Sequence, residues 1–394
     1  MLTATELVED IRVISADSHV EEPIDELIAY LPEHLRRESR REIEQNGETV
    51  IEVPGLSPIT LDYADRRLGG DGTDQRVYDE LEFRSDTTGG RDLDVRIEKI
   101  ESDGVWGEII FPNRNLALGA HPNPEYQREM AKIHNDWLVD VFSAHWGRFA
   151  PAAVVPTTVP EDSAAEVFRA KTLGFNSVML PPVVPWLPYW HKSWDVLWSA
   201  LEETRLPVNF HVFSGNTVQG ADISNPWVLT PELLERGRAV ARGERLEEKI
   251  GTSNMAMMGA MSVVNHLIGS GALDRHPDMR FVLTECEAGW LPWALQQLDL
   301  MQKRRSLGMV SLQMRPSEYF QRQGWATFIE DKTAIDMLEY IGEDRLMWTN
   351  DYPHDEGTYL ESVQTIDRLL GHLPKRTQRK LLHDNAAALY SFDA

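Results

Sequence analysis

Eight short apolar runs, separated by longer polar stretches, restrict the fold of this sequence more than any other feature. Each run is nearly continuous in apolar residues, which is typical of strands buried on both faces of a parallel sheet. The runs are residues 12–19, 104–113, 149–156, 177–182, 207–214, 280–285, 325–330 and 345–351. We therefore expect eight buried parallel strands.

Helical patterns lie between most of these runs, over residues 161–173, 191–204 and 333–341. Alternating strands and helices predict parallel βα units. Eight such units suggest an α/β fold of the closed (β/α)₈ type, a TIM-type barrel. A doubly wound open sheet is the competing architecture. No Gly-x-Gly-x-x-Gly pattern follows the first run, which weakens the dinucleotide-binding version of that alternative.

The length of 394 residues suits a single barrel domain over residues 1–394 with insertions. Two connections are long, at about residues 20–103 after the first strand and 215–279 after the fifth. Both would lie on the C-terminal face, where barrel enzymes carry their active sites. We interpret them as lids or dimer contacts.

Charge and composition exclude several classes of protein. The net charge of −24, from 39 basic and 63 acidic residues, disfavours nucleic acid and anionic membranes as partners. A lone cysteine, Cys286, excludes an internal disulfide and a cysteine-rich zinc site. No signal peptide and no apolar stretch of membrane-spanning length is evident, so we expect a cytoplasmic protein.

Polar side chains occur near the ends of several predicted strands. Asp17 and His19 are two residues apart, so a strand would point both to one face. His211 lies in the fifth run and Asp351 ends the eighth. Each has a structural alternative: a strand-end turn for Asp17, a hydrogen-bonded core histidine for His211, and a helix N-cap for Asp351. A carboxylate and an imidazole are also natural ligands of Zn²⁺, Mn²⁺ or Fe²⁺.

Glu285 ends the sixth run and could be a metal ligand, a residue that orients a ligand, or a proton shuttle. We interpret its neighbour Cys286 as a small buried residue. Polar groups thus fall at the same end of the first, fifth, sixth and eighth strands of the predicted barrel. Taken together, they predict a metal site on its C-terminal face.

Several segments resemble the amidohydrolase superfamily, specifically its amidohydrolase-2 branch. The resemblance spans residues 11–390 and is carried by residues 16–23 (ADSHVEEP), 96–105, 109–112, 267–277, 281–285, 289–292, 348–354 (WTNDYPH) and 385–387. It implies one divalent metal ion, Zn²⁺, Mn²⁺ or Fe²⁺, held by Asp17, His19, His211 and Asp351. It also suggests a homodimer.

Three departures from the family pattern bear on the chemistry. Asp17 stands where many members have histidine, which makes the ligand set harder and Mn²⁺ or Fe²⁺ more plausible beside Zn²⁺. No lysine ends the fourth run, so a carboxylated lysine bridging two metals is not expected. Glu285 occupies a position where some decarboxylases of the branch have histidine. This departure favours a reaction that uses water.

We therefore expect a metal-dependent hydrolase acting on a small organic substrate through a metal-activated water. Asp351 would be the catalytic base and later the acid, and Glu285 would tune the metal or relay protons. One alternative is non-oxidative decarboxylation of an aromatic or enoic acid on the same site. An alternative of another class is a catalytically inactive barrel that serves as a binding protein.

Aromatic residues after the fourth run supply candidate pocket residues. A spacing of four from Trp186 to Trp198 indicates first a helix face packed on the barrel. Trp186 and Trp190, together with His354, are nevertheless our candidates for lining a pocket for a flat substrate.

Overall fold

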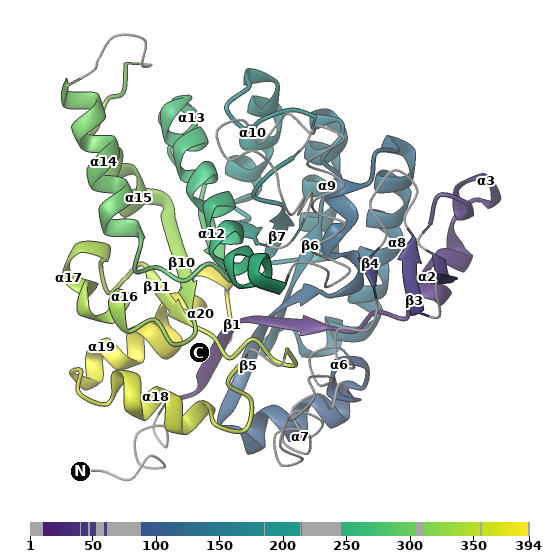
Figure 1. The fold of residues 1–394 in the computed structure, drawn as a ribbon, viewed down its shortest axis with the longest axis horizontal. Coiled ribbons are helices and arrows are strands. Elements are labelled where there is room, and N and C mark those ends of the chain that lie inside the picture. The colour runs from purple at the N-terminus through teal and green to yellow at the C-terminus, as the bar shows by residue number, and fades with distance from the viewer. Residues whose placement is uncertain are drawn as a thin grey trace.

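The computed structural model describes residues 11–39, 41–45, 48–52, 59–60, 88–184, 186–212, 214, 246–304, 311–354 and 357–392. Eight parallel strands at its centre are hydrogen-bonded in the order β1-β5-β6-β7-β8-β9-β10-β11 (Figure 1). They are β1 (Val13–Val20), β5 (Val105–Pro112), β6 (Phe149–Val154), β7 (Ser177–Leu180), β8 (Val208–His211), β9 (Phe281–Thr284), β10 (Gly324–Phe328) and β11 (Leu346–Trp348). Each predicted run contains or overlaps one strand, so the predicted TIM-type barrel is confirmed.

The first and last strands of the sheet meet through two backbone hydrogen bonds. The amide of Asp351 donates to the carbonyl of Asp17 at 3.1 Å, and the amide of His19 donates to the carbonyl of Tyr352 at 2.7 Å. These bonds join the ends of β1 and β11 and make the barrel nearly closed. They also place two predicted metal-binding segments side by side.

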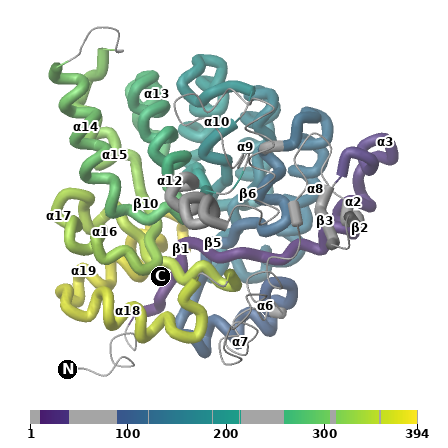
Figure 2. Tube along the Cα trace, in the orientation of Figure 1, coloured from purple at the N-terminus to yellow at the C-terminus, as the bar shows by residue number. Residues whose placement is uncertain are grey.

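Helices surround the strands, as the tube in Figure 2 shows. Those that follow barrel strands include α8 (Pro124–Phe142), α9 (Pro160–Leu173), α10 (Asp195–Thr204), α12 (Leu246–Gly269), α14 (Leu291–Arg304), α15 (Pro316–Gln323), α16 (Lys332–Asp336), α17 (Leu338–Ile341) and α18 (Ser362–Leu370). Shorter elements are α13 (Ala272–Arg275), α19 (Lys375–Arg379), α20 (Asn385–Tyr390), the 3₁₀-helices η1 (Arg114–Ala120), η2 (Ser143–His145) and η3 (Lys192–Trp194), and the π-helix η4 (Lys380–Asp384).

Local sequence signals account for several helix boundaries. Asn123 caps α8 by accepting hydrogen bonds from two backbone amides, and proline follows it at the first helical position. Gly174, with φ of 98°, ends α9 in the left-handed conformation that glycine adopts without steric penalty. The helix predicted over residues 333–341 is divided, because Met337 separates α16 from α17.

The insertion after β1 contains secondary structure of its own. It includes α2 (Ile24–Tyr30), α3 (Glu33–Arg36), α6 (Thr88–Arg91), α7 (Leu93–Ser102) and an antiparallel sheet of β2 (Arg41–Gln45), β3 (Glu48–Glu52) and β4 (Ile59–Thr60). Residues 61–87 of this insertion and 215–245 of the second lie outside the described residues. Their interpretation as lids or dimer contacts stays a prediction.

A bulge in β1 determines which of its side chains face the barrel interior. Ile14 and Ala16 pack in one core cluster with Met179 and Val282, whereas Val20 packs in the other. The pairing of β1 with β5 shifts register between Ser15 and Ser18. The extra residue reverses the alternation of faces, so Asp17 follows Ala16 into the interior.

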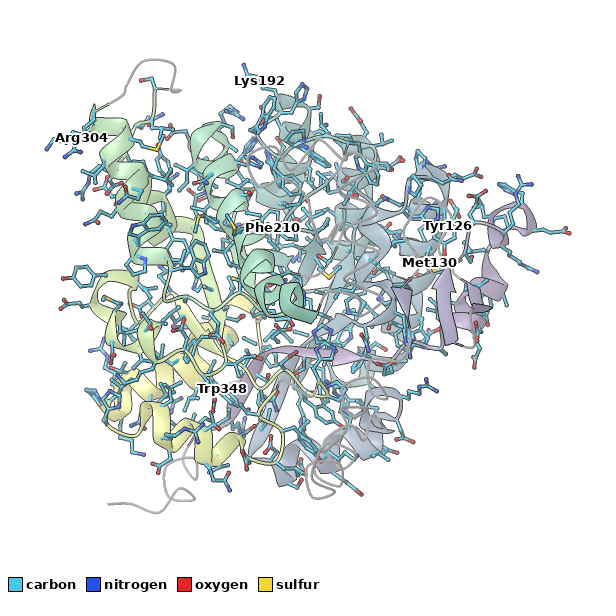
Figure 3. All side chains as sticks on the ribbon, viewed as in Figure 1. Tyr126, Met130, Lys192, Phe210, Arg304 and Trp348 are labelled. Atoms are coloured by element: carbon cyan, nitrogen blue, oxygen red, sulfur yellow. The ribbon has the colours of Figure 1, made fainter. Side chains whose placement is uncertain are left out.

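Large apolar side chains fill the space between strands and helices (Figure 3). Phe210 of β8 and Trp348 of β11 are completely buried, whereas Lys192 and Arg304 lie at the periphery. The strands that carry polar end groups are therefore fixed by packing along their length.

A buried ion pair ties α7 to the barrel. The Nε atom of Arg96 donates to Oε2 of Glu108 at 2.6 Å, and its Nη1 donates to the carbonyl of His19 at 2.7 Å. The guanidinium carbon also lies 5.1 Å from the centre of the Tyr352 ring. Arg96 thereby connects α7, β5 and the end of β1.

Replacing one partner of this pair is expected to be costly. Arg96→Met should lower the free energy of unfolding by about 3–5 kcal/mol, because it leaves the Glu108 carboxylate buried and unpaired. Arg96→Met combined with Glu108→Leu should recover most of that loss. Urea unfolding measures both, with Lys332→Met in the exposed Lys332–Asp336 pair as the control, expected to cost under about 1 kcal/mol. A double variant no more stable than Arg96→Met would contradict the assignment.

His134 of α8 is a buried histidine whose imidazole ring is neutral in the folded protein near neutral pH. Its Nδ1 accepts a hydrogen bond from Nδ2 of Asn115 at 3.1 Å, and burial lowers its pKa to about 3. In the unfolded chain the pKa should be about 6.5. Between these values the unfolded state binds the proton and the folded state does not.

The contribution of His134 to stability should therefore fall as pH drops from about 6.5 toward 3, by up to about 1.4 kcal/mol per pH unit. His134→Gln has no such titration. As the pH falls, the unfolding free energy of the wild type should therefore decrease relative to that of His134→Gln. Urea unfolding at several pH values measures it, and a pH-independent difference would show that folding leaves the pKa of His134 unchanged.

Candidate metal centre

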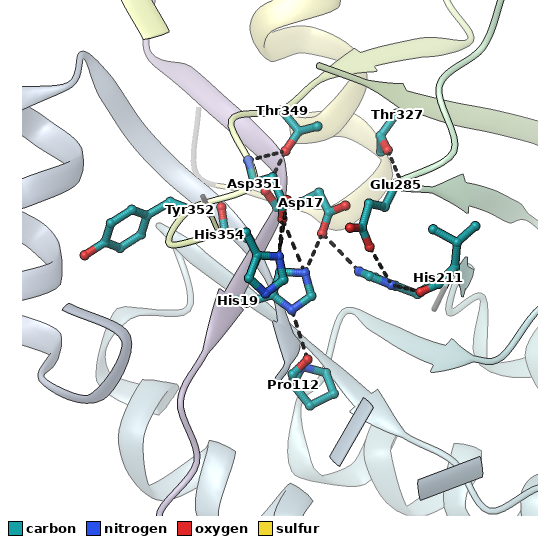
Figure 4. A network of polar contacts seen from close by, with 12 residues as sticks. Asp17, His19, Pro112, His211, Glu285, Thr327, Thr349, Asp351, Tyr352 and His354 are labelled. Carbon is teal, nitrogen blue, oxygen red and sulfur yellow. Dashed lines mark hydrogen bonds and ion pairs between the residues drawn. The ribbon is translucent and has the colours of Figure 1, made fainter. Parts of the chain in front are cut away.

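Six polar side chains meet at the C-terminal ends of the barrel strands (Figure 4). They come from the ends of β1, β8, β9 and β11 and are Asp17, His19, His211, Glu285, Asp351 and His354. The four predicted ligands are completely buried. The structure therefore brings together side chains that lie up to 337 residues apart in the sequence.

The possible ligand atoms form two groups that share His19. One group is Asp17, His19, His211 and Glu285, the other is His19, Asp351 and His354, and the atoms of each group lie within 4.8 Å of one another. Nε2 of His211 lies 3.3 Å from Oδ1 of Asp17, and Nε2 of His19 lies 3.6 Å from the same oxygen. Oδ1 of Asp351 lies 3.4 Å from Nε2 of His19. Three buried atoms, Asp17 Oδ2, His19 Nε2 and Asp351 Oδ1, make no hydrogen bond within the described part of the chain. Because uncompensated buried polar atoms are costly, the donor set fits a divalent cation.

Hydrogen bonds on the outer ring nitrogens orient both histidines. Nδ1 of His19 donates to the carbonyl of Pro112 at 3.0 Å, which turns its Nε2 inward. Nδ1 of His211 lies 2.7 Å from the carbonyl of Val212. Such contacts fix the tautomer and ring orientation of a metal-binding histidine. Burial, together with the nearby His354 and His211, lowers the pKa of His19 well below its usual value, which favours the neutral imidazole.

Glu285 contacts the other side of His211 from Asp17. Its Oε2 lies 3.3 Å from Nδ1 of His211, while Asp17 approaches Nε2. One carboxylate oxygen of Glu285 also groups within 4.8 Å of ligand atoms of Asp17, His19 and His211. The geometry makes Glu285 suited to orient His211 or to complete the coordination shell.

Asp351 adopts a backbone conformation that is unusual for a residue with a side chain. Its φ of 55° lies in the left-handed region, as does the φ of 57° at Glu285. Strained residues of this kind concentrate at functional sites. Burial raises the pKa of the Asp351 carboxyl, which favours a protonated form.

His354 lies between Asp351 and solvent. Its Nδ1 lies 3.2 Å from Oδ2 of Asp351, within hydrogen-bond distance, and its ring centre lies 4.0 Å from that of His19. Its side chain is 23% exposed, in contrast to the buried ligands. The predicted pocket residue thus directly contacts the predicted base.

The two predicted pocket tryptophans contact residues outside the candidate centre. The indole of Trp186 donates to the carbonyl of Thr157 at 2.9 Å, and Trp190 is 51% exposed beside His191. The expected continuous helix face is wrong for both, because α10 begins only at Asp195; Trp194 and Trp198 are buried as expected. A pocket role for Trp186 or Trp190 stays a prediction. Cys286 is fully buried, as predicted.

The sequence interpretation missed Phe111 and the β1 bulge. The ring centre of Phe111 lies 4.8 Å from that of His211 and 6.2 Å from that of His19. Its position at the end of the second run was the available signal, but an apolar residue there carries no chemical signature. The bulge depends on pairing with β5 and leaves no mark in the local pattern.

Comparison with known proteins identifies the class. The model of the amidohydrolase family matches residues 115–392, so the chain belongs to this family, in its amidohydrolase-2 branch. A curated relative, the gamma-resorcylate decarboxylase of Rhodococcus jostii strain RHA1, is 25% identical over 327 residues, which cover 76% of this chain and 88% of that protein.

Solved structures share the fold. An amidohydrolase of Mycobacterium avium subsp. paratuberculosis has a TM-score of 0.71 at 20% identity and covers 98% of this chain and 99% of its own. A 5-carboxyvanillate decarboxylase of Novosphingobium aromaticivorans, complexed with manganese and 4-hydroxy-3-methoxy-5-nitrobenzoic acid, has a TM-score of 0.67 at 18% identity over 100% of both chains. That protein therefore binds both a metal and a small aromatic acid.

The expectation of a hydrolase is wrong. The relatives with a named activity are decarboxylases of aromatic acids, which supports the alternative over the main expectation. The error came from reading Glu285 as a departure toward water chemistry, whereas in the structure it contacts the outer nitrogen of His211. Among the described residues, no helix combines the length and apolar character needed to cross a membrane.

Metal binding should depend on His211. Manganese at 100 times its dissociation constant should add about 2.7 kcal/mol to the unfolding free energy of the wild type. His211→Ala should lose most of this stabilisation, because it removes one of the inward-facing nitrogens. His383→Gln is the matched control, since His383 is a buried histidine that contacts Arg12 at the opposite end of β1. Thermal unfolding with and without Mn²⁺ measures the effect, and equal stabilisation of His211→Ala would place the metal elsewhere.

Proposed function

We propose that this protein is a metal-dependent, non-oxidative decarboxylase of a small aromatic acid. One observation carries the proposal most directly. A buried carboxyl group, Asp351, lies against the candidate metal ligand His19 and is connected through His354 to solvent. The named activities of the relatives support the same reaction class.

Manganese is the metal that the donor set favours. The proposed ligands are Asp17, His19, His211 and Asp351, two carboxylates and two imidazoles, with Glu285 orienting His211. Oxygen-rich sets of this kind suit Mn²⁺ better than sets with more nitrogen or sulfur donors. The bound ion would supply positive charge that orients and neutralises the oxygens of an acidic substrate. Manganese is present in the related decarboxylase structure.

The chemical step that remains for the protein is proton delivery to carbon. Loss of CO₂ from an aromatic acid exchanges a carboxylate for a hydrogen on the same ring carbon. Asp351 donates its proton to that carbon, and the bond to the carboxylate then breaks. The electron pair of that bond returns to the ring, and CO₂ leaves. Its buried position against His19 and His354 supports its role as the acid.

Asp351 must regain a proton before the next turnover. His354 is the suitable donor, because its Nδ1 lies 3.2 Å from Oδ2 of Asp351 and its side chain is partly exposed. His354 therefore links the buried acid to solvent. Glu285, on the far side of His211, keeps that imidazole pointed toward Asp17.

Asp351→Asn should abolish CO₂ release while leaving the fold intact. The amide cannot donate a proton to carbon, so kcat should fall by at least about 10²–10⁴-fold, the usual contribution of a positioned acid. The assay is CO₂ release from a panel of hydroxylated benzoic acids with Mn²⁺ present. Asp136→Asn, at a largely exposed aspartate paired with Arg169, is the control and should be fully active.

Two outcomes would overturn the proposal. Undiminished turnover by Asp351→Asn would remove the acid from the mechanism. Turnover of a substrate with consumption of water and no CO₂ would return the protein to hydrolysis. Circular dichroism of both variants separates a loss of chemistry from a loss of fold.

A further inference from the structure

A buried polar cluster lies behind the metal centre and connects α7 to the turn that carries Asp351. Its charged member is Asp103, which follows the last residue of α7 and is 3% exposed. Asn350, which is completely buried, lies between Asp103 and the turn. Neither residue contacts the predicted ligand atoms directly, so the function derived above does not explain either of them.

Asp103 holds two segments of the C-terminal part of the chain. Its Oδ1 accepts from the backbone amide of Ser362 at 3.2 Å, and its Oδ2 accepts from the Ser362 hydroxyl at 2.5 Å. Its Oδ2 also accepts from Nδ2 of Asn350 at 3.4 Å. One carboxylate thereby connects the end of α7, the start of α18 and the residue before Asp351.

Asn350 brackets Asp351 from both sides. Its Oδ1 accepts from the amide of Tyr352 at 3.3 Å and from the hydroxyl of Ser18 at 3.4 Å. Its own backbone amide donates to the hydroxyl of Ser15 at 3.1 Å. The residues on either side of Asp351 are thus attached to one another and to β1.

The charge of Asp103 determines which way the Asn350 amide faces. A carboxylate offers only acceptors, so it pairs with the NH₂ group of Asn350 and repels its oxygen. The oxygen is then available to the Tyr352 amide and the Ser18 hydroxyl. The reverse orientation would place two acceptors together at Asp103 and two donors together at Tyr352.

We propose that Asp103 and Asn350 are a positioning pair that holds Asp351 in its left-handed conformation, with its carboxyl directed at the metal and the substrate. The inference rests on the proposed function of Asp351. The conformation at Asp351 has a φ of 55° and is costly for a residue with a side chain, so surrounding contacts must impose it. A misplacement of about 1 Å at a reacting group can reduce the rate about 10²-fold.

Exchanging the two side chains tests the pair. Asp103→Asn leaves only one acceptor oxygen at this position, so its NH₂ group must face either the NH₂ group of Asn350 or the backbone amide of Ser362, and Asn350→Asp places two carboxylates together. The double variant, Asp103→Asn with Asn350→Asp, restores a donor facing an acceptor in the opposite sense. Each protein is assayed for kcat and KM at saturating Mn²⁺, for Mn²⁺ affinity by calorimetry, and for stability in urea.

The single variants should lower kcat by about 10–10²-fold with little change in KM, and should weaken Mn²⁺ binding several-fold. The double variant should recover kcat to within about tenfold of wild type and restore Mn²⁺ affinity. Glu166→Gln is the matched control, because Asn135 donates to buried Glu166 at 2.6 Å away from the metal centre. It should lose stability and keep both kcat and Mn²⁺ affinity.

The outcomes separate the two proposals. Single variants that lose stability but keep wild-type kcat and Mn²⁺ affinity would overturn the positioning role, as would a double variant no better than the worse single. A different result would overturn decarboxylation but support the positioning pair. In that case the wild type releases no CO₂ from any acid tested, while the single variants still bind Mn²⁺ more weakly and the double variant regains the affinity.

Discussion

The hydrogen-bonded junction between the first and last barrel strands is the constraint on which the candidate metal centre depends. Asp351 donates its amide to the carbonyl of Asp17, and His19 donates its amide to the carbonyl of Tyr352. These bonds nearly close the barrel and also set the separation of the candidate ligands. The same two hydrogen bonds therefore join the barrel ends and bring the candidate ligands of β1 and β11 together.

The negative charge of the carboxylates at this junction must also be neutralised. Asp17 and Asp351 are completely buried, Glu285 lies close by, and the surrounding protein carries a net charge of −24. Buried carboxylates repel one another and lose the hydration that would stabilise their charge. A divalent cation would relieve both costs and would satisfy the carboxylate oxygens of Asp17 and Asp351 that make no hydrogen bond within the described part of the chain. In the proposed decarboxylation, Asp351 would carry a proton, which would neutralise the remaining charge.

The identity of residue 285 and its position in the structure lead to different conclusions about the reaction. Glu285 in place of histidine was treated as a sign of water chemistry. In the structure its carboxylate faces the outer nitrogen of His211, so it bears on ligand orientation and does not discriminate between the two reactions. The proposed reaction class rests instead on the proposed acid at Asp351 and on relatives with a named activity.

The sequence by itself determined the eight buried strands, their alternation with helices and the strand ends at which Asp17, His19, His211 and Asp351 lie. It could do so because burial on both faces demands continuous apolar runs, and parallel strands place their C-terminal ends together. Only the tertiary structure decided the β1 bulge, the left-handed turns at Glu285 and Asp351, and the contacts of Arg96 and Asp103 with the ends of β1 and β11. Those features arise from pairing between residues distant in the chain, and no local pattern of side chains specifies them.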